Sequence, residues 1–277
     1  MKTQLLVCFF LLCFGAISSA SEQLPFVNEG DADFTAIEDL KDVNSGTTVE
    51  DGFVANPKDW PASFFFTAKG KDNQWNYCTS VLIGPSVVLT AAHCVGDGKH
   101  IRLKFEKRNT TYQGVCTRCP GFITSDWSSD YALCKLDCPI IDIQCENIGP
   151  QPTLTSNSEL MITGFGCTSL ENQSLDGLYR IGISKIDKVQ ESDNYIRTQG
   201  IAAICNGDSG GPAFFILDKS LNKRVIVAVN SRRELDSKCS LLASLNTKAA
   251  KNFISSWKLH SNCEICDGKS DLKGCRP

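Results

Sequence analysis

Short runs of apolar and β-branched residues, separated by turn-forming residues, recur along most of this chain. Glycine, proline, asparagine, aspartate and serine cluster between the runs. Strands of this length and spacing are typical of an all-β sandwich or barrel. Examples are the runs at 62–68, 78–83, 87–91, 101–105, 131–136, 159–163, 178–186, 213–217 and 224–230.

One segment near the end has a different periodicity. Ala249, Phe253 and Trp257 recur every four residues, with Ala250 and Ile254 beside them. This spacing places apolar side chains on one face of a helix. We therefore expect a short amphipathic helix over 248–259, followed by a cysteine-containing tail, residues 260–277, whose role the sequence does not indicate.

The first 48 residues predict processing and secretion. Residues 1–20 have a lysine near the start, an apolar run and a small-residue end, as in a secretory signal, and the run is too short to span a membrane. Residues 21–48 carry seven acidic residues and one lysine, and we expect a propeptide there. The remainder is close to neutral, which argues against nucleic-acid or membrane binding. Asn109 and Asn172 begin glycosylation tripeptides, in keeping with an extracellular protein.

The chain has 15 cysteines, of which two lie in the signal segment, so that 13 remain. Such a density favours disulfides in an oxidising compartment, and the odd number requires one unpaired thiol. Cys134, in an apolar run, is the expected buried free thiol. The pairs 116/119 and 263/266 have the spacing of zinc or redox sites, but disulfides are favoured in a secreted chain without paired histidines. No metal or cofactor is expected.

Three motifs carry the chemistry. The hexapeptide 207–212 reads Gly-Asp-Ser-Gly-Gly-Pro, in which Ser209 is a hydroxyl nucleophile among glycines that leave backbone N–H groups open. Thr-Ala-Ala-His-Cys at 90–94 and Ser-Asp-Tyr-Ala-Leu at 129–133 precede it. Their order, His93, Asp130, Ser209, and their surroundings make residues 49–259 resemble the chymotrypsin/trypsin family of serine endopeptidases.

This resemblance implies two six-stranded antiparallel β-barrels with a short C-terminal α-helix, and we expect the linker between the barrels near 148–157. Ser209 would be the nucleophile, His93 its general base, and Asp130 the residue that orients His93. Asp126 is a nearby competitor of Asp130 for that role. The backbone N–H groups of Gly207 and Ser209 would form the oxyanion hole.

The resemblance also implies an activation step and two disulfides. The freed amino group of Val49 would pair with Asp208 and order the substrate pocket. The implied bridges are Cys78–Cys94 and Cys205–Cys239.

Three positions depart from the family. Thr48 precedes Val49 where an arginine or lysine is usual, so a trypsin-like activating cut is not expected. Ala203 occupies the floor of the primary pocket, so that a basic substrate side chain would lack a counter-charge. Ser231 and Arg233 align with the wall of the primary pocket. Glycine is usual at the position of Arg233, and an arginine there favours small or acidic substrate residues immediately before the scissile bond.

The sequence thus predicts a secreted serine endopeptidase made as a zymogen. Its expected partners are protein or peptide substrates, an activating protease and protein inhibitors. A non-catalytic homologue that acts as a binding or regulatory module is the alternative, and hydrolysis of non-peptide esters would use the same chemistry.

Overall fold

The computed structural model describes residues 53–56, 58–69, 75–96, 99–105, 110–122, 127–167, 175–190, 195–200, 202–219, 222–234, 238–268 and 272–276. The predicted signal segment 1–20, the propeptide 21–48, and the residues Val49, Asn109, Asp126 and Asn172 lie outside these ranges.

The first half of the described chain forms a closed antiparallel barrel with the strand order β2-β3-β4-β7-β6-β5. Buried aliphatic side chains fill it, since strand residues alternate between the two faces of a sheet. The strands are β2 (Ser63–Lys69), β3 (Trp75–Gly84), β4 (Val87–Thr90), β5 (Lys99–Phe105), β6 (Thr110–Arg118) and β7 (Ala132–Leu136).

The second half, joined by β1 from the start of the described chain, forms an antiparallel sheet in the order β1-β9-β10-β13-β12-β11-β8, in which β8 also pairs with β9. Six strands are thereby linked in a ring, and the two-residue strand β1 adds to β9. These strands are β1 (Phe53–Val54), β8 (Glu159–Gly164), β9 (Arg180–Gln190), β10 (Tyr195–Gln199), β11 (Pro212–Asp218), β12 (Lys223–Arg233) and β13 (Cys239–Ser244). The predicted pair of six-stranded barrels is confirmed, and β1 is an addition to it.

One α-helix, α1 (Lys248–Ser261), closes the described fold, as the periodicity predicted. The Thr247 hydroxyl caps its first turn by accepting a hydrogen bond from the Ala250 N–H at 3.0 Å. Asn262 ends it in the left-handed conformation, with φ of 52°. In the part of the chain that the structure describes, no helix is both long and apolar enough to cross a membrane.

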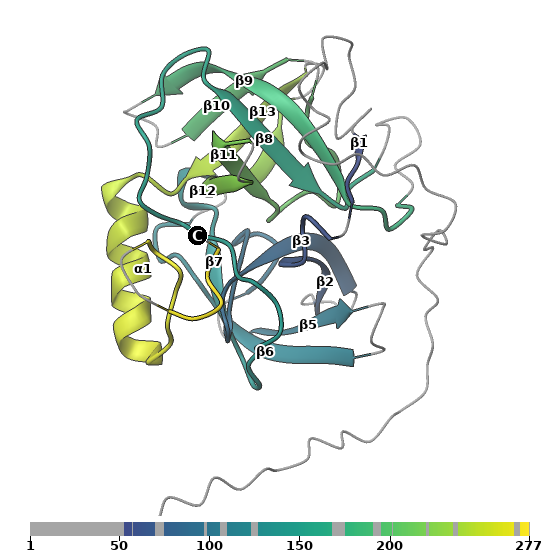
Figure 1. The fold of residues 1–277 in the computed structure, drawn as a ribbon, viewed down its shortest axis with the longest axis vertical. Coiled ribbons are helices and arrows are strands. Elements are labelled where there is room, and N and C mark those ends of the chain that lie inside the picture. The colour runs from purple at the N-terminus through teal and green to yellow at the C-terminus, as the bar shows by residue number, and fades with distance from the viewer. Residues whose placement is uncertain are drawn as a thin grey trace, which may run out of the picture.

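The C-terminal tail, residues 262–268 and 272–276, folds back beside the segment that joins the two barrels (Figure 1). This segment, residues 137–158, contains the predicted linker. Cys266 N–H donates to the carbonyl of Ile83 in β3, and its own carbonyl accepts from Ile148 N–H, at 2.7 and 2.9 Å. Cys145 N–H donates to the Gly274 carbonyl at 2.6 Å. The tail therefore joins the first barrel to the inter-barrel segment.

A buried charge cluster lies where the tail ends. The guanidinium groups of Arg224, in β12, and Arg276, in the tail, bond the carboxylate of Glu146 at 2.5 and 3.1 Å. Arg224 also donates to the Asp59 carbonyl at 2.6 Å and stacks on Trp60 at 3.8 Å from the ring centre. Since a buried carboxylate requires partners, the tail supplies one of the two cations that Glu146 receives.

Candidate active site

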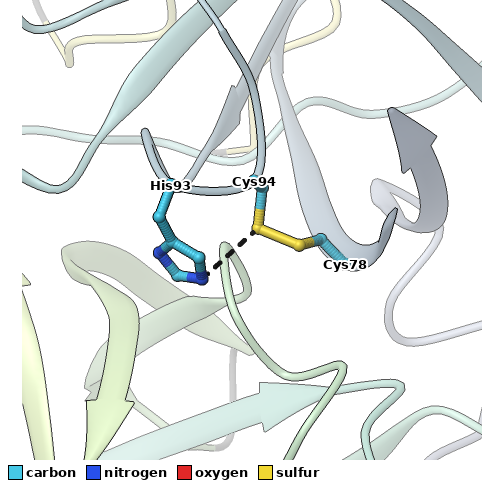
Figure 2. A group of neighbouring side chains, drawn as sticks. All are labelled: Cys78, His93 and Cys94. Carbon is cyan, nitrogen blue, oxygen red and sulfur yellow. Dashed lines mark hydrogen bonds between the residues drawn. A yellow bond between two sulfur atoms is a disulfide. The ribbon is translucent and has the colours of Figure 1, made fainter. Parts of the chain in front are cut away.

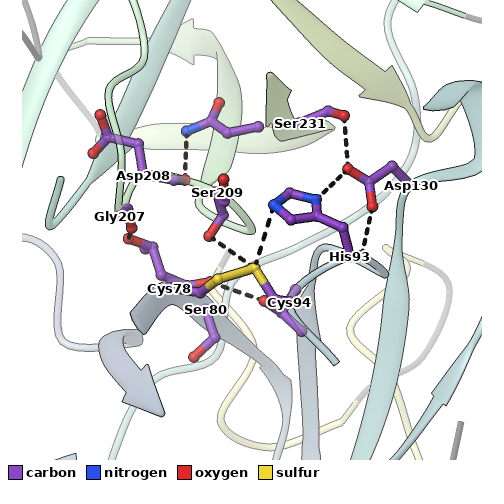
Figure 3. Close-up of a disulfide and its surroundings, with 12 residues drawn as sticks. Cys78, Ser80, His93, Cys94, Asp130, Gly207, Asp208, Ser209 and Ser231 are labelled. Carbon is purple, nitrogen blue, oxygen red and sulfur yellow. Dashed lines mark hydrogen bonds and ion pairs between the residues drawn. A yellow bond between two sulfur atoms is a disulfide. The ribbon is translucent and has the colours of Figure 1, made fainter. Parts of the chain in front are cut away.

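His93 and Asp130 meet at one edge of the first barrel. His93 follows the end of β4, and Asp130 follows a single 3-10 turn, Trp127–Ser129, that leads into β7. The carboxylate of Asp130 accepts from the backbone N–H of His93 at 2.9 Å and lies 2.7 Å from the ring Nδ1 (Figure 3). A proton on Nδ1 leaves Nε2 free to accept another, which is the tautomer that a general base requires.

A third donor to Asp130 comes from the second barrel. Ser231, in β12, donates its hydroxyl hydrogen to Asp130 Oδ2 at 2.6 Å. Asp130 is completely buried, so these three hydrogen bonds replace the water that a carboxylate would otherwise hold. The sequence placed Ser231 on the pocket wall only. Its contact with Asp130 was missed, because two residues a hundred positions apart give no local signal.

Ser209 lies in a tight loop, residues 205–211, that precedes β11, and we call this segment the Ser209 loop. Two contacts with Thr79 of β3 fix it: Thr79 N–H donates to the Ser209 carbonyl, and the Thr79 hydroxyl donates to the Gly207 carbonyl, both at 2.8 Å. Ser209 then lies on the Nε2 side of the His93 ring (Figure 3). Both side chains are partly exposed, so a substrate can reach them.

The glycines of the Ser209 loop are required by its shape. Gly207 and Gly210 have φ of 99° and 84°, in the region that residues with a side chain rarely adopt. A Cβ on Gly210 would also come closer than 3.0 Å to Thr90 Oγ1 and to the Thr79 carbonyl. The hexapeptide that contains Ser209 is therefore packed closely against the first barrel.

Asp208 is buried on the other side of the same loop. Its two carboxylate oxygens accept from the N–H groups of Gly166 and Cys205 at 2.8 and 2.7 Å. Burial raises the pKa of Asp208 to about 7, although these hydrogen bonds and the charge of Arg180 act to lower it. Its predicted partner, Val49, is outside the described residues.

The predicted bridge Cys78–Cys94 is confirmed. Cys94 Sγ lies 3.8 Å from His93 Nε2, so these three side chains gather atoms of the kinds that bind metals (Figure 2). Both sulfurs are joined to each other, however, and a disulfide sulfur is not the thiolate that zinc requires. The cluster is therefore a disulfide beside the imidazole.

Two cysteine predictions are wrong. Cys205 pairs with Cys167 and not with Cys239, because the Cys167 N–H bonds the carbonyl of the adjacent Asn206 at 2.9 Å and brings the two sulfurs together. Cys134 is not a free thiol: it is the register partner of Cys116 across β6 and β7, and the two form a disulfide. A fourth disulfide, Cys266–Cys275, closes the tail.

The residues assigned to the substrate pocket lie in different environments. Ala203 is fully buried and carries no charge, whereas Arg233, at the end of β12, is partly exposed. Between Ser231 and Arg233, the exposed Arg232 stacks over Trp127, with its guanidinium carbon 5.4 Å from the ring centre. Neither this cation nor its aromatic partner belongs to the three motifs, so the sequence gives no sign of their contact.

Comparison with known proteins agrees with this arrangement. The family model described as Trypsin matches residues 49–236. Chymotrypsin-like elastase family member 1 of Homo sapiens is 23% identical over 224 residues, which cover 71% of this chain and 86% of that protein. Tryptase of Mus musculus is 27% identical over 201 residues, covering 58% of this chain and 71% of that protein. Chymotrypsin-C of Bos taurus is 27% identical over 200 residues, covering 61% and 73%.

Solved structures have the same fold. The structure titled GrC superposes with a TM-score of 0.61 at 18% identity, covering 76% of this chain and 98% of that one. The structure titled HL collagenase gives a TM-score of 0.60 at 16% identity, covering 77% and 99%. At these identities the likeness concerns the fold.

Proposed function

Because this chain belongs to the trypsin family and is a serine protease of that fold, we propose that it is a secreted endopeptidase with a Ser209–His93–Asp130 triad. The observation that carries this proposal is the hydrogen bond between His93 Nδ1 and the buried Asp130 carboxylate. It leaves Nε2 as the basic nitrogen on the side where Ser209 lies.

In the proposed reaction, Ser209 Oγ attacks the carbonyl carbon of the scissile bond while His93 Nε2 takes the hydroxyl proton. The negative oxygen of the tetrahedral intermediate is stabilised by the N–H groups of Gly207 and Ser209. His93 then gives its proton to the leaving amine, and an acyl-enzyme remains on Ser209. Water, activated by His93, releases the acid. Asp130 holds the Nδ1 proton and stabilises the imidazolium in each half-reaction.

The protein is proposed to be made as a zymogen, with removal of residues 1–20 on secretion and of 21–48 on activation. The freed ammonium of Val49 would pair with Asp208, and glycans would occupy Asn109 and Asn172. The elevated pKa of Asp208 supports this step, since a new ammonium beside a buried carboxyl would stabilise its ionised form. Thr48 requires an activating protease that does not depend on a basic residue.

Cleavage after lysine or arginine is not expected. Ala203 offers no carboxylate to a basic side chain, and Arg233 would repel one. We propose a preference for small or acidic residues immediately before the scissile bond.

A fluorophosphonate probe tests the proposed function. The expected result is covalent labelling of the processed protein and none of the Ser209→Ala variant. Absence of labelling in a sample whose N-terminus is Val49 would contradict catalysis and favour the non-catalytic binding module. A panel of peptides that differ only in the residue before the cleaved bond tests the specificity, and preferred cleavage after lysine or arginine would contradict it.

A further inference from the structure

Arg232 is an exposed cation on the strand that holds the candidate triad together. It follows Ser231, whose hydroxyl bonds Asp130, and β12 has an irregular register between positions 230 and 232. Its guanidinium carbon lies 5.4 Å from the centre of the Trp127 ring and 5.9 Å from that of Tyr195. Two aromatic rings from other elements therefore hold the guanidinium in place.

Trp127 connects this cation to the catalytic histidine. The centre of its ring lies 5.2 Å from that of the His93 imidazole, at an interplanar angle of 54°. The 3-10 turn that begins at Trp127 ends just before Asp130, so the indole and the catalytic carboxylate are positioned by the same short segment. The indole thus lies against both the His93 imidazole and the Arg232 guanidinium.

The acidic side chains near Arg232 are already engaged. Glu234 accepts from Arg197 through both of its oxygens, at 3.1 and 2.9 Å. These bonds, together with the charges of Arg197 and Arg232, hold the pKa of Glu234 below the usual range. Arg197 also pairs with Asp187. Asp130 is buried and bonded to His93 and Ser231. Within the described ranges, no carboxylate lies within 4.0 Å of the Arg232 guanidinium.

A stacked guanidinium still has free N–H groups, because stacking occupies its faces and leaves its edge open. That edge is suited to a carboxylate, which accepts two parallel N–H bonds. The centre of the Trp127 ring lies 5.2 Å from that of the imidazole and 5.4 Å from the guanidinium carbon. An extended peptide advances about 3.4 Å per residue, so side chains two to four residues from the scissile bond are within reach of this cation. Since Ser231 and Arg233 are assigned to the pocket for the preceding residue, the contact falls on the same, acyl side.

We propose that Arg232, held on Trp127, is a specificity-determining residue that binds an acidic side chain two to four residues before the scissile bond. This inference rests on the proposed protease function. It concerns a position different from the pocket of Ala203 and Arg233, and it makes acidic peptide segments the preferred substrates.

The test uses the processed protein and peptides in which one of these three positions is aspartate, asparagine or lysine. We expect kcat/KM to be about tenfold higher for aspartate at one position, since charged hydrogen bonds are the strong ones. In Arg232→Gln, the ratio of kcat/KM for the aspartate peptide to that for the asparagine peptide should fall to about one. In Arg232→Glu, the lysine peptide should become the preferred substrate. Lys185→Gln, an equal charge change at an exposed residue of β9, should keep the wild-type ratio. An unchanged ratio in Arg232→Gln, or no discrimination by the wild type, would overturn the proposal.

A binding measurement separates this inference from the proposed function. Fluorescein-labelled aspartate and asparagine peptides are titrated onto the Ser209→Ala protein, with and without Arg232→Gln, and anisotropy is recorded. Arg232-dependent tighter binding of the aspartate peptide, together with failed fluorophosphonate labelling of the wild type, contradicts catalysis alone. Labelling without any Arg232-dependent preference contradicts the acidic subsite alone.

Discussion

Arg276 and Glu146 form an ion pair inside the protein, with 3.1 Å between the arginine Nε and the carboxylate Oε2. Glu146 is fully buried, and Arg276 is 8% exposed. Because Arg276 belongs to the tail and Glu146 to the segment between the barrels, the end of the chain is part of the interior. Burial lowers the pKa of the Arg276 guanidinium, and the nearby Glu146 carboxylate opposes that effect.

Glu146→Gln is expected to destabilise the protein more than Arg276→Gln. The first change leaves two buried guanidinium groups without a carboxylate and should lower the free energy of unfolding by about 3–5 kcal/mol. The second leaves Glu146 bonded to Arg224 and should lower it by about 1–3 kcal/mol. Urea denaturation measures both. Lys258→Gln, which breaks the partly exposed pair with Asp267, serves as control and should change it by less than about 1 kcal/mol. Equal effects of all three changes would contradict the interior role of the tail.

Ser231→Ala is expected to lower kcat/KM about tenfold and to lower the free energy of unfolding by about 1.5–3 kcal/mol. The variant removes one of three hydrogen bonds to Asp130, and a hydrogen bond to a charged group contributes about 1.5–3 kcal/mol. Asp130→Asn should lose about 10⁴ in kcat, because the wrong tautomer of His93 is then stabilised. Steady-state kinetics on one peptide measure the loss of activity of each variant, and urea titrations measure its loss of stability. An activity of Ser231→Ala equal to that of the wild type would show that the bond to Asp130 is dispensable.

The unprocessed protein is expected to lose a contribution to stability as the pH rises from about 4 to about 7. The pKa of Asp208 is raised in the folded state, from an ordinary 3.8 to about 7, so the folded protein holds this proton more tightly than the unfolded chain. This stabilisation is fully present when the pH is below 3.8, the ordinary pKa. It decreases as the pH rises toward about 7, the pKa in the folded protein, and it is lost above that pH. Asp208→Asn removes it, so the difference between wild type and variant should change by a few kcal/mol across that window.

This difference is measured by urea unfolding at several pH values. In a sample with a free Val49 amino group, the ammonium should favour the ionised carboxylate, and the loss toward pH 7 should diminish or reverse. A wild type and Asp208→Asn pair that keep a constant difference from pH 4 to 8 would contradict the elevated pKa.

Gly210→Ala is expected to remove activity and to destabilise the fold by about 3 kcal/mol. The added methyl group would meet Thr90 and Thr79 at less than 3.0 Å, and the backbone conformation itself is unfavourable for alanine. Gly274→Ala is the matched control, since its φ of 100° is equally unfavourable but no atom lies within 4 Å of the added carbon. It should cost about 1 kcal/mol and leave activity intact. Similar losses in the two variants would indicate that backbone conformation alone decides the outcome.

The sequence predicted the architecture because its signals are local. Strand runs, turn residues and the periodicity at 248–259 report on neighbours within a few positions, and they predicted an all-β fold and α1. The pair of six-stranded barrels was implied by the family resemblance. The motif around His93 likewise predicted the Cys78–Cys94 bridge through the family resemblance, and the structure has it.

What the sequence did not predict depends on register between distant strands. The partner of Cys134 is decided by the pairing of β6 with β7, and that of Cys205 by the path of the loop at Cys167. The hydroxyl of Ser231 reaches Asp130 only once the two barrels have docked. The tail gave no signal either, since a lone arginine at position 276 is usually a surface residue.

Each barrel hydrogen-bonds a residue of the candidate site on the other barrel. Thr79 of the first barrel bonds the Ser209 loop, and Ser231 of the second bonds Asp130. Each half therefore carries a residue that positions a candidate catalytic residue of the other half. A chimaera that takes one barrel from a distant relative would lose the contact of Thr79 with the Ser209 loop or that of Ser231 with Asp130. Recombination at the boundary between the barrels would keep both contacts only if position 79 is taken together with the second barrel and position 231 together with the first.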